Sequence, residues 1–133
     1  MAAGINILIN DGGAPARIMK LGVAAANIDA GTFVGIDTNG KVSATILDAS
    51  PVNSKKVGVL LVDAVSGEPA SVITGSGLMC YLDTASNTIG IGDTLSHDAN
   101  GIALANSQAD EVLAIALEIG GTTHTGYTKV LLK

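Results

Sequence analysis

The chain has 133 residues, the length of one ordinary domain, and 47% of them are hydrophobic, which excludes a chain that is disordered throughout. The net charge is −5 and only seven Lys and Arg residues are scattered along the chain, so the clustered cations that nucleic-acid binding requires are missing. Charged residues make up 14%, which fits a protein that buries neutral surface in an assembly and equally one whose surface is rich in Thr, Ser, Asn and Gly.

Other classes are excluded by single features. One cysteine, Cys80, excludes an internal disulfide framework and a cysteine-rich zinc cluster. No apolar run approaches the roughly 18 residues that cross a bilayer. The first basic residue is Arg17, so the N-terminus lacks the charged region of a secretory signal. We expect a soluble protein made in a cytoplasm, with no membrane partner.

The first segment, residues 1–27, has a strand-like start. Ile5, Ile7 and Ile9 alternate with other residues before Gly12, Gly13 and Pro15 interrupt the pattern, which then resumes as an extended segment from Arg17 to Gly22. Two interpretations remain open: an arm that reaches a partner, or an edge strand of the domain.

Residues 28–133 predict a single β domain, because runs of Val, Ile, Thr and Leu alternate with Gly, Asn and Asp. Asn-Gly pairs at 39–40 and 100–101 can supply the positive φ angles of tight hairpin turns. Strands are expected over residues 33–36, 42–45, 57–62, 70–74, 78–82, 94–97, 102–105, 112–117 and 127–132.

The domain contains an internal repeat. Residues 28–73 and 89–132 share an ordered series of motifs, and an offset of 61 residues carries the first Asn-Gly turn onto the second. Two units are too few for a solenoid. We therefore predict an all-β fold, a compact barrel or sandwich in which the two units are related by approximate twofold symmetry, with an extended N-terminal arm.

No residue pattern predicts catalysis. Ser96, His97 and Asp98 gather the residue types of a nucleophilic triad, but neighbours in a strand point to opposite faces, so turn-flanking polar residues are the better interpretation. Asp93, Asp98 and Asp110 lack the regular loop of a calcium site, and His97 and His124 lack zinc spacing. We expect no enzyme activity, no cofactor and no bound metal.

One family resemblance follows from the ordered motifs. They run from 30–42 through 57–59, 63–64 and 67–72, and again from 89–95 through 98–101, 114–118 and 130–132. Over residues 17–133 this series resembles the phage capsid decoration, or cement, proteins. The resemblance implies a head-stabilising virion protein on the capsid exterior, made in the host cytoplasm. It also implies the major capsid protein and further copies of the chain, commonly a homotrimer, as partners, with the N-terminal segment in contact with the capsid.

The expected contact residues lie in that segment: Ile5, Ile7, Ile9, Arg17 and Met19. Their alternation suits the addition of a strand to an exposed sheet edge. Two alternatives remain: an oligomeric shell or scaffold protein of a host, and a biotinyl or lipoyl carrier domain. The second rests on a passing likeness of the residues around Lys20 to a carrier hairpin tip, although Lys20 precedes both repeats rather than lying between them.

Overall fold

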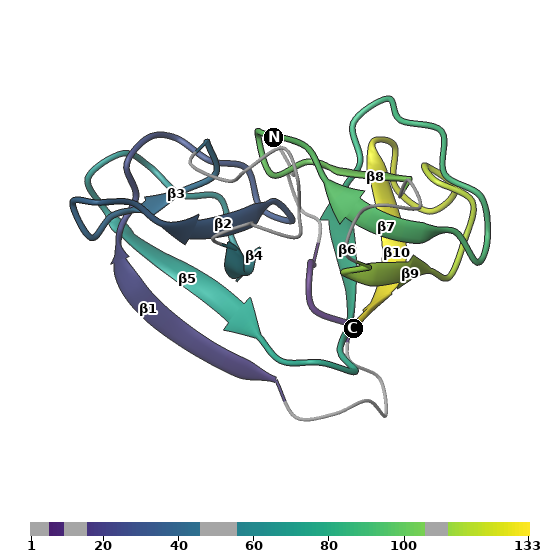
Figure 1. The fold of residues 1–133 in the computed structure, drawn as a ribbon, viewed down its shortest axis with the longest axis horizontal. Coiled ribbons are helices and arrows are strands. Elements are labelled where there is room, and N and C mark those ends of the chain that lie inside the picture. Colours follow the sequence, from purple (N-terminus) through teal and green to yellow (C-terminus); the bar gives the residue numbers. More distant parts are fainter. Residues whose placement is uncertain (1–5, 10–15, 46–55, 106–111) are drawn as a thin grey trace.

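The computed structural model describes residues 6–9, 16–45, 56–105 and 112–133, which form ten strands in two five-stranded antiparallel sheets (Figure 1). This confirms the predicted all-β class. The sheets form a sandwich of two similar units, and they do not close into a barrel. The described residues contain no helix long and apolar enough to cross a membrane.

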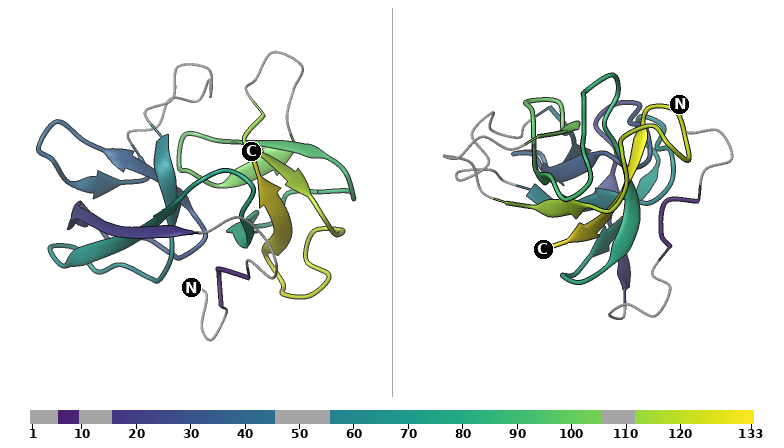
Figure 2. Two further views of the ribbon diagram at one scale, coloured as in Figure 1. Left: turned by 90° about the horizontal axis from the view of Figure 1, so that it is seen from below. Right: turned by 90° about the vertical axis from the view of Figure 1, so that its right-hand side faces the viewer.

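Sheet 1 contains strands β1 to β5, and sheet 2 contains strands β6 to β10 (Figures 1 and 2). Sheet 1 has the order β1-β5-β4-β2-β3, and sheet 2 repeats it as β6-β10-β9-β7-β8. The strands of sheet 1 are β1 (Arg17–Val23), β2 (Phe33–Ile36), β3 (Val42–Ser43), β4 (Lys56–Leu60) and β5 (Pro69–Thr74). Those of sheet 2 are β6 (Met79–Asp83), β7 (Thr94–His97), β8 (Ala103–Ala105), β9 (Ala114–Ala116) and β10 (Tyr127–Leu132).

Strand register relates the two sheets residue by residue. Val72 of β5 pairs with Met19 on one side and with Leu60 on the other, and Val130 of β10 pairs with Cys80 and Ala116 in the same way. Met19 and Cys80 are 61 residues apart, the offset seen in the turns. Strand β1 thus has the place in sheet 1 that β6 has in sheet 2, and the repeating unit begins upstream of residue 28.

The two Asn-Gly turns are built alike, but not with the predicted dihedral angles. Gly40 and Gly101 have positive φ angles of 76° and 77°. Asn39 and Asn100 do not have positive φ angles, because Ala85 is the one non-glycine among the described residues that does. The carboxylate of the preceding Asp supplies the rest of the turn. Oδ1 of Asp37 accepts from the N–H groups of Asn39 and Lys41 at 2.8 Å, and Asp98 does the same in the second turn.

Each sheet has two unlike faces, which we call front and back. The front face of sheet 1 presents Phe33, Val59 and Ile73, which are paired across β2, β4 and β5, and its back face presents Val34, Leu60 and Val72. The back face forms a small core of its own with residues of the connecting loops. The front face belongs to the large core, together with β6, β9 and β10 of sheet 2.

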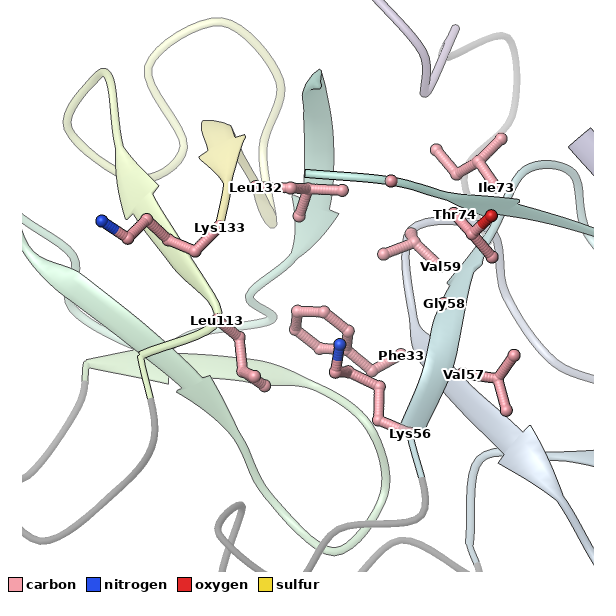
Figure 3. Close-up of a pocket in the computed structure, with 11 residues that line it drawn as sticks. Phe33, Lys56, Val57, Gly58, Val59, Ile73, Thr74, Leu113, Leu132 and Lys133 are labelled. Atoms are coloured by element: carbon pink, nitrogen blue, oxygen red, sulfur yellow. The ribbon is translucent and has the colours of Figure 1, made fainter. Parts of the chain in front are cut away.

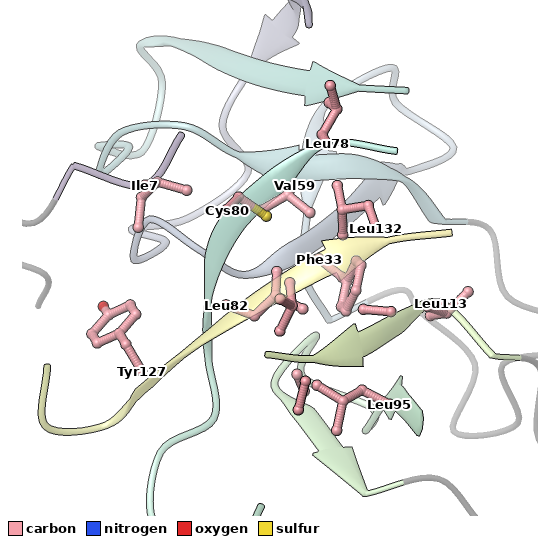
Figure 4. Packing of buried hydrophobic residues seen from close by; sticks show 14 of the residues in the cluster. Ile7, Phe33, Val59, Leu78, Cys80, Leu82, Leu95, Leu113, Tyr127 and Leu132 are labelled. Carbon is pink, nitrogen blue, oxygen red and sulfur yellow. The ribbon is translucent and has the colours of Figure 1, made fainter. Parts of the chain in front are cut away.

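The back face of sheet 2 presents Cys80, Ala116 and Val130, which are paired as Met19, Leu60 and Val72 are in sheet 1. These residues belong to the large core, so the front face of sheet 1 packs on the back face of sheet 2. Figure 4 shows Phe33 among Leu82, Leu113 and Leu132, and its ring lies 5.8 Å from the ring of His97. Burying a phenylalanine in this way contributes about 1.5–3 kcal/mol relative to leaving it exposed.

This packing corrects the expected twofold symmetry. The N–H of Phe33 donates to the carbonyl of Gly101 at 2.9 Å, so a twofold axis would require a matching contact between Thr94 and Gly40. Gly40 is exposed, and a Cβ built on it meets nothing within 4 Å. The two units contact each other through different surfaces, front to back, whereas a twofold axis would bring the same surface of each unit together.

Candidate interaction surfaces

The N-terminal segment is a strand added to its own chain. Leu8 forms an antiparallel bridge with Cys80, Ile9 N–H donates to the carbonyl of Met79 at 3.0 Å, and Tyr81 N–H donates to the carbonyl of Ile7 at 2.9 Å. Ile7 is buried and packs in the large core, whereas Ile9 is half-buried. The segment thus covers the free edge of β6, and Ile7 offers no surface to a partner in this conformation. Ile5 lies outside the described residues.

The other predicted contact residues lie on β1, which is the edge strand of sheet 1. Arg17, Ile18, Met19 and Lys20 are all exposed. Their contact with a capsid or a second subunit stays a prediction. Lys20 pairs with Ser71 in mid-strand rather than at a hairpin tip, so the structure removes the geometric basis for a carrier lysine.

The front face of sheet 2 is a second exposed surface with apolar residues, in addition to β1, and it was not predicted from the sequence. Thr94, Ile115 and Leu131 pair across β7, β9 and β10 as Phe33, Val59 and Ile73 do in sheet 1. The three front-face residues of sheet 1 are at most 1% exposed, whereas Thr94 is exposed and the other two are half-buried. Beside them lie two further exposed apolar residues, Ile91 and Leu117.

Of the three residues that have the types of a nucleophilic triad, His97 and Asp98 have structural partners, whereas Ser96 is buried. Nδ1 of His97 lies 2.7 Å from the carbonyl oxygen of Asp98, and the carboxylate of Asp98 accepts from the backbone of its own turn. His97 also packs against Phe33. Ser96 Oγ is buried and has no hydrogen-bond partner among the described residues. Among those residues no group of three His, Cys, Asp or Glu side chains is placed to hold a metal ion.

Burial shifts the pKa of three groups near the contact between the units. The pKa of the Cys80 thiol is raised to about 12 because the side chain is desolvated. Burial also raises the pKa of Tyr127, with the nearby Asp83 carboxylate adding to the shift. Burial raises the pKa of Asp83, and this effect exceeds that of the hydrogen bond from the Ala85 N–H, which lowers the pKa. Tyr127 Oη donates to the carbonyl of Ala30 at 3.4 Å, so this cluster is part of the packing between units.

Two cavities lie along the same contact. The first is about 30 Å³ in volume, and Figure 3 shows Leu113 and Leu132 facing Phe33 and Lys56 across it. The second is about 190 Å³ and lies between the segment around Ile28 and the residues Asp83 and Asn100. Both are smaller than the roughly 300 Å³ at which small-molecule sites usually begin. The first is about the size of a single water site.

Comparison with known proteins finds solved structures of the same fold. The chain resembles the N base of the head fiber gp8.5 of bacteriophage phi29 with a TM-score of 0.65 and 16% sequence identity, covering 90% of this chain and 95% of that one. No protein-family model matches the sequence, and no curated protein matches it. At this identity the likeness demonstrates a shared fold, and it extends over nearly the whole of both chains.

Proposed function

We propose that the chain is a structural protein of a phage virion that binds the outer surface of an icosahedral capsid, as a homotrimer, and stabilises it. The observation that carries the proposal is the fold match, which spans almost the full length of both this chain and a phage head fiber base. The motif series that resembles decoration proteins supports the same role independently, because it rests on sequence and not on coordinates.

Surface composition supports a protein partner for this role. The net charge of −5 disfavours nucleic acid, and several large apolar side chains remain exposed in the single chain. The exposed apolar residues are Ile18, Met19, Val57, Val62, Val65, Ile91, Leu117 and Ile119. We take the major capsid protein and further copies of the chain as the partners. No catalytic, cofactor or metal role forms part of the proposal.

The test is binding to undecorated heads assembled from the major capsid protein of the same genome. Purified protein is mixed with heads over a range of ratios, and head-bound protein is measured after gradient sedimentation. Saturation at a fixed number of copies for each capsomer, with a higher temperature of head disruption, is expected. Absence of the protein from the head fraction at every ratio would contradict the proposal.

The solved relative favours a second candidate, since its printed description is the base of a head fiber. A fibre base has to hold an appendage on the head, and it has no need to make the shell more stable. Saturable binding with an unchanged disruption temperature would therefore favour the fibre-base role over stabilisation. The same titration distinguishes the two, because occupancy and stability are measured on one sample.

A further inference from the structure

Strand β1 has one paired edge and one free edge. On one side it pairs with β5, and on the other side no described strand lies beside residues 17–20, because β1 is the first strand in the order of sheet 1 (Figure 1). Its equivalent β6 is also the first strand of its sheet, but segment 7–9 of the same chain covers the outer edge of β6. Among the described residues, the equivalent edge of sheet 1 has no such cover.

The register shows which backbone groups of β1 point outward. The N–H of Leu61 donates to the carbonyl of Ser71 at 2.9 Å, so Ser71 and Ile73, two residues apart on β5, direct their backbone groups toward β4. Their partners on β1 are Lys20 and Ile18. In an antiparallel pair, opposite residues that do not exchange hydrogen bonds direct their N–H and C=O groups away from the partner strand. The N–H and C=O groups of Ile18 and Lys20 therefore face the free edge.

Strand β6 provides an independent check of this direction. Met79 and Tyr81 lie 61 residues after Ile18 and Lys20, and their backbone groups bond the added segment 7–9. The carbonyl of Met79 accepts a hydrogen bond from this segment at 3.0 Å, and the N–H of Tyr81 donates one to it at 2.9 Å. Ile18 and Lys20 thus present the same acceptor and donor that bind an added strand in sheet 2.

The side chains along this edge combine cations with apolar groups. Arg17 and Lys20 are exposed, and between them Ile18 and Met19 are 55% and 38% exposed. Neither β1 nor β5 contains an acidic residue, although the whole chain has 12 acidic and 7 basic residues. The ribbon of β1 and β5 is therefore locally basic in an acidic protein, and the strand that complements its charge is one that brings carboxylates.

We propose that the free edge of β1 binds an extended acidic segment of a partner protein, which adds a strand to sheet 1 through the backbone of Ile18 and Lys20. The side chains that complement residues 17–20 follow the order acidic, apolar, apolar, acidic. This order is the same in both directions, so it suits a parallel and an antiparallel strand. The contact is defined by this chemistry and does not depend on capsid binding.

A second copy of the chain is a poorer occupant of this edge. Pairing β1 with β1 of another copy would gather four cations on two strands and supply no carboxylate. Cations on an edge strand commonly prevent pairing with an identical strand. Segment 7–9 of another copy contains no acidic residue and already pairs with β6 of its own chain. An acidic segment of a different protein therefore fits the edge better.

The test measures amide proton exchange by NMR in the full chain, with the peptide acetyl-Thr-Glu-Val-Val-Glu-Thr-amide as the probe. In the free chain the amides of Ile18 and Lys20 should exchange rapidly, whereas the amide of Met19, which faces β5, should exchange slowly. At a peptide concentration about ten times the dissociation constant, exchange at Ile18 and Lys20 should slow about tenfold, because most chains then carry the peptide. A control peptide with Lys in place of both Glu residues should bind at least about tenfold more weakly.

Two variants separate backbone pairing from side-chain contact. Ile18→Pro and Ile18→Ala both remove the isoleucine, but only proline removes the outward N–H. An edge strand tolerates a proline at a position whose N–H faces solvent. The proline variant should bind the glutamate peptide about two- to tenfold more weakly than the alanine variant, which is the factor that one net hydrogen bond supplies. Equal affinities would mean that side chains alone hold the peptide, and would overturn the proposal.

The natural chain decides the question even if the proline variant does not fold. Unchanged exchange at Ile18 and Lys20 up to about 10 mM glutamate peptide, a range that detects millimolar dissociation constants, overturns the proposal. An equal effect of the lysine peptide also overturns it. So does protection of these two amides in the free chain: protection that rises with protein concentration would mean that a second copy occupies the edge, and constant protection would mean that the chain itself covers it. The titration contains no capsid protein, so its failure leaves the proposed capsid binding standing.

Discussion

The contact between Gly101 and Phe33 can be tested with a pair of equivalent glycines. Gly40 and Gly101 occupy the same place in the two repeats, with φ angles of 76° and 77°, and each follows an Asp whose carboxylate holds the turn. A Cβ on Gly40 meets nothing within 4 Å, whereas one on Gly101 would overlap the carbonyl oxygen of Phe33 and crowd the Thr32 side chain. Alanine thus adds the same backbone strain at both positions, but a collision at only one.

The expected magnitudes follow from this difference. A left-handed alanine costs about 1–2 kcal/mol, partly offset by about 0.4–1 kcal/mol because the unfolded chain loses freedom. Gly40→Ala should therefore lower the free energy of unfolding by about 1 kcal/mol. In Gly101→Ala, overpacking adds about 1–3 kcal/mol, and weakening of the hydrogen bond from Phe33 N–H adds about 1 kcal/mol. We expect the Gly101 variant to be less stable than the Gly40 variant by about 2–4 kcal/mol.

The assay is urea unfolding followed by far-ultraviolet circular dichroism. The slope of the free energy of unfolding against urea concentration is compared between variants. An unchanged slope shows that the same surface is exposed on unfolding, so the midpoints report stability. If the two variants lose the same free energy, the turn at Gly101 does not hold the sheets together, and the front-to-back packing of the two units is wrong.

Two further predictions use residues of the same contact. Phe33→Ala should lower the free energy of unfolding by about 3–5 kcal/mol, whereas Thr94→Ala at the equivalent exposed position should change it by less than about 0.5 kcal/mol; equal effects in urea titrations would contradict the unequal burial of the front faces. Because burial raises the folded-state pKa of Cys80 to about 12, its contribution to stability is present below the ordinary thiol pKa and is lost as the pH rises towards 12. For each pH unit above the ordinary thiol pKa, the free energy of unfolding of the natural chain should fall by about 1.4 kcal/mol more than that of Cys80→Ala. Free energies of unfolding that change in parallel for the two proteins between about pH 8 and pH 11 would refute this.

Local patterns in the sequence predict most of the strands. The expected strands 33–36, 94–97 and 127–132 have the bounds that β2, β7 and β10 adopt, because β-branched runs and Gly-containing turns determine them locally. The extended segment from Arg17 was also recognised, but its place in the repeat was not. Its residues share few identities with β6, and the relation becomes visible only when Met19 and Cys80 are found opposite equivalent valines.

The surfaces depend on tertiary packing, which local patterns do not encode. The alternation of Ile5, Ile7 and Ile9 predicts a strand that extends a sheet, and residues 7–9 extend sheet 2 at β6. Which edge receives the strand depends on how the chain folds back, so the sequence left the choice between its own sheet and a partner open. A signal for the unequal front faces was present, since the repeat alignment places Phe33 opposite Thr94 and Ala30 opposite Ile91.

That alignment also bears on how a duplicated module ends. In a stack of repeats, the terminal units are usually made soluble by polar residues on their outer faces. Thr94 in place of the buried Phe33 is such a substitution, and the exposed Arg17 and Lys20 on β1 have the same effect at the other end. Ile91 and Leu117 do not follow this rule. Ile91 is larger than Ala30, its equivalent in the unit whose front face is buried, and Leu117 is as apolar as its equivalent Leu61. The front face of sheet 2 is thus polar at Thr94, the equivalent of Phe33, and apolar at the neighbouring positions, which differs from a uniformly polar terminal unit. This distribution is expected of a surface that excludes a second deep core but retains an apolar contact area for another subunit.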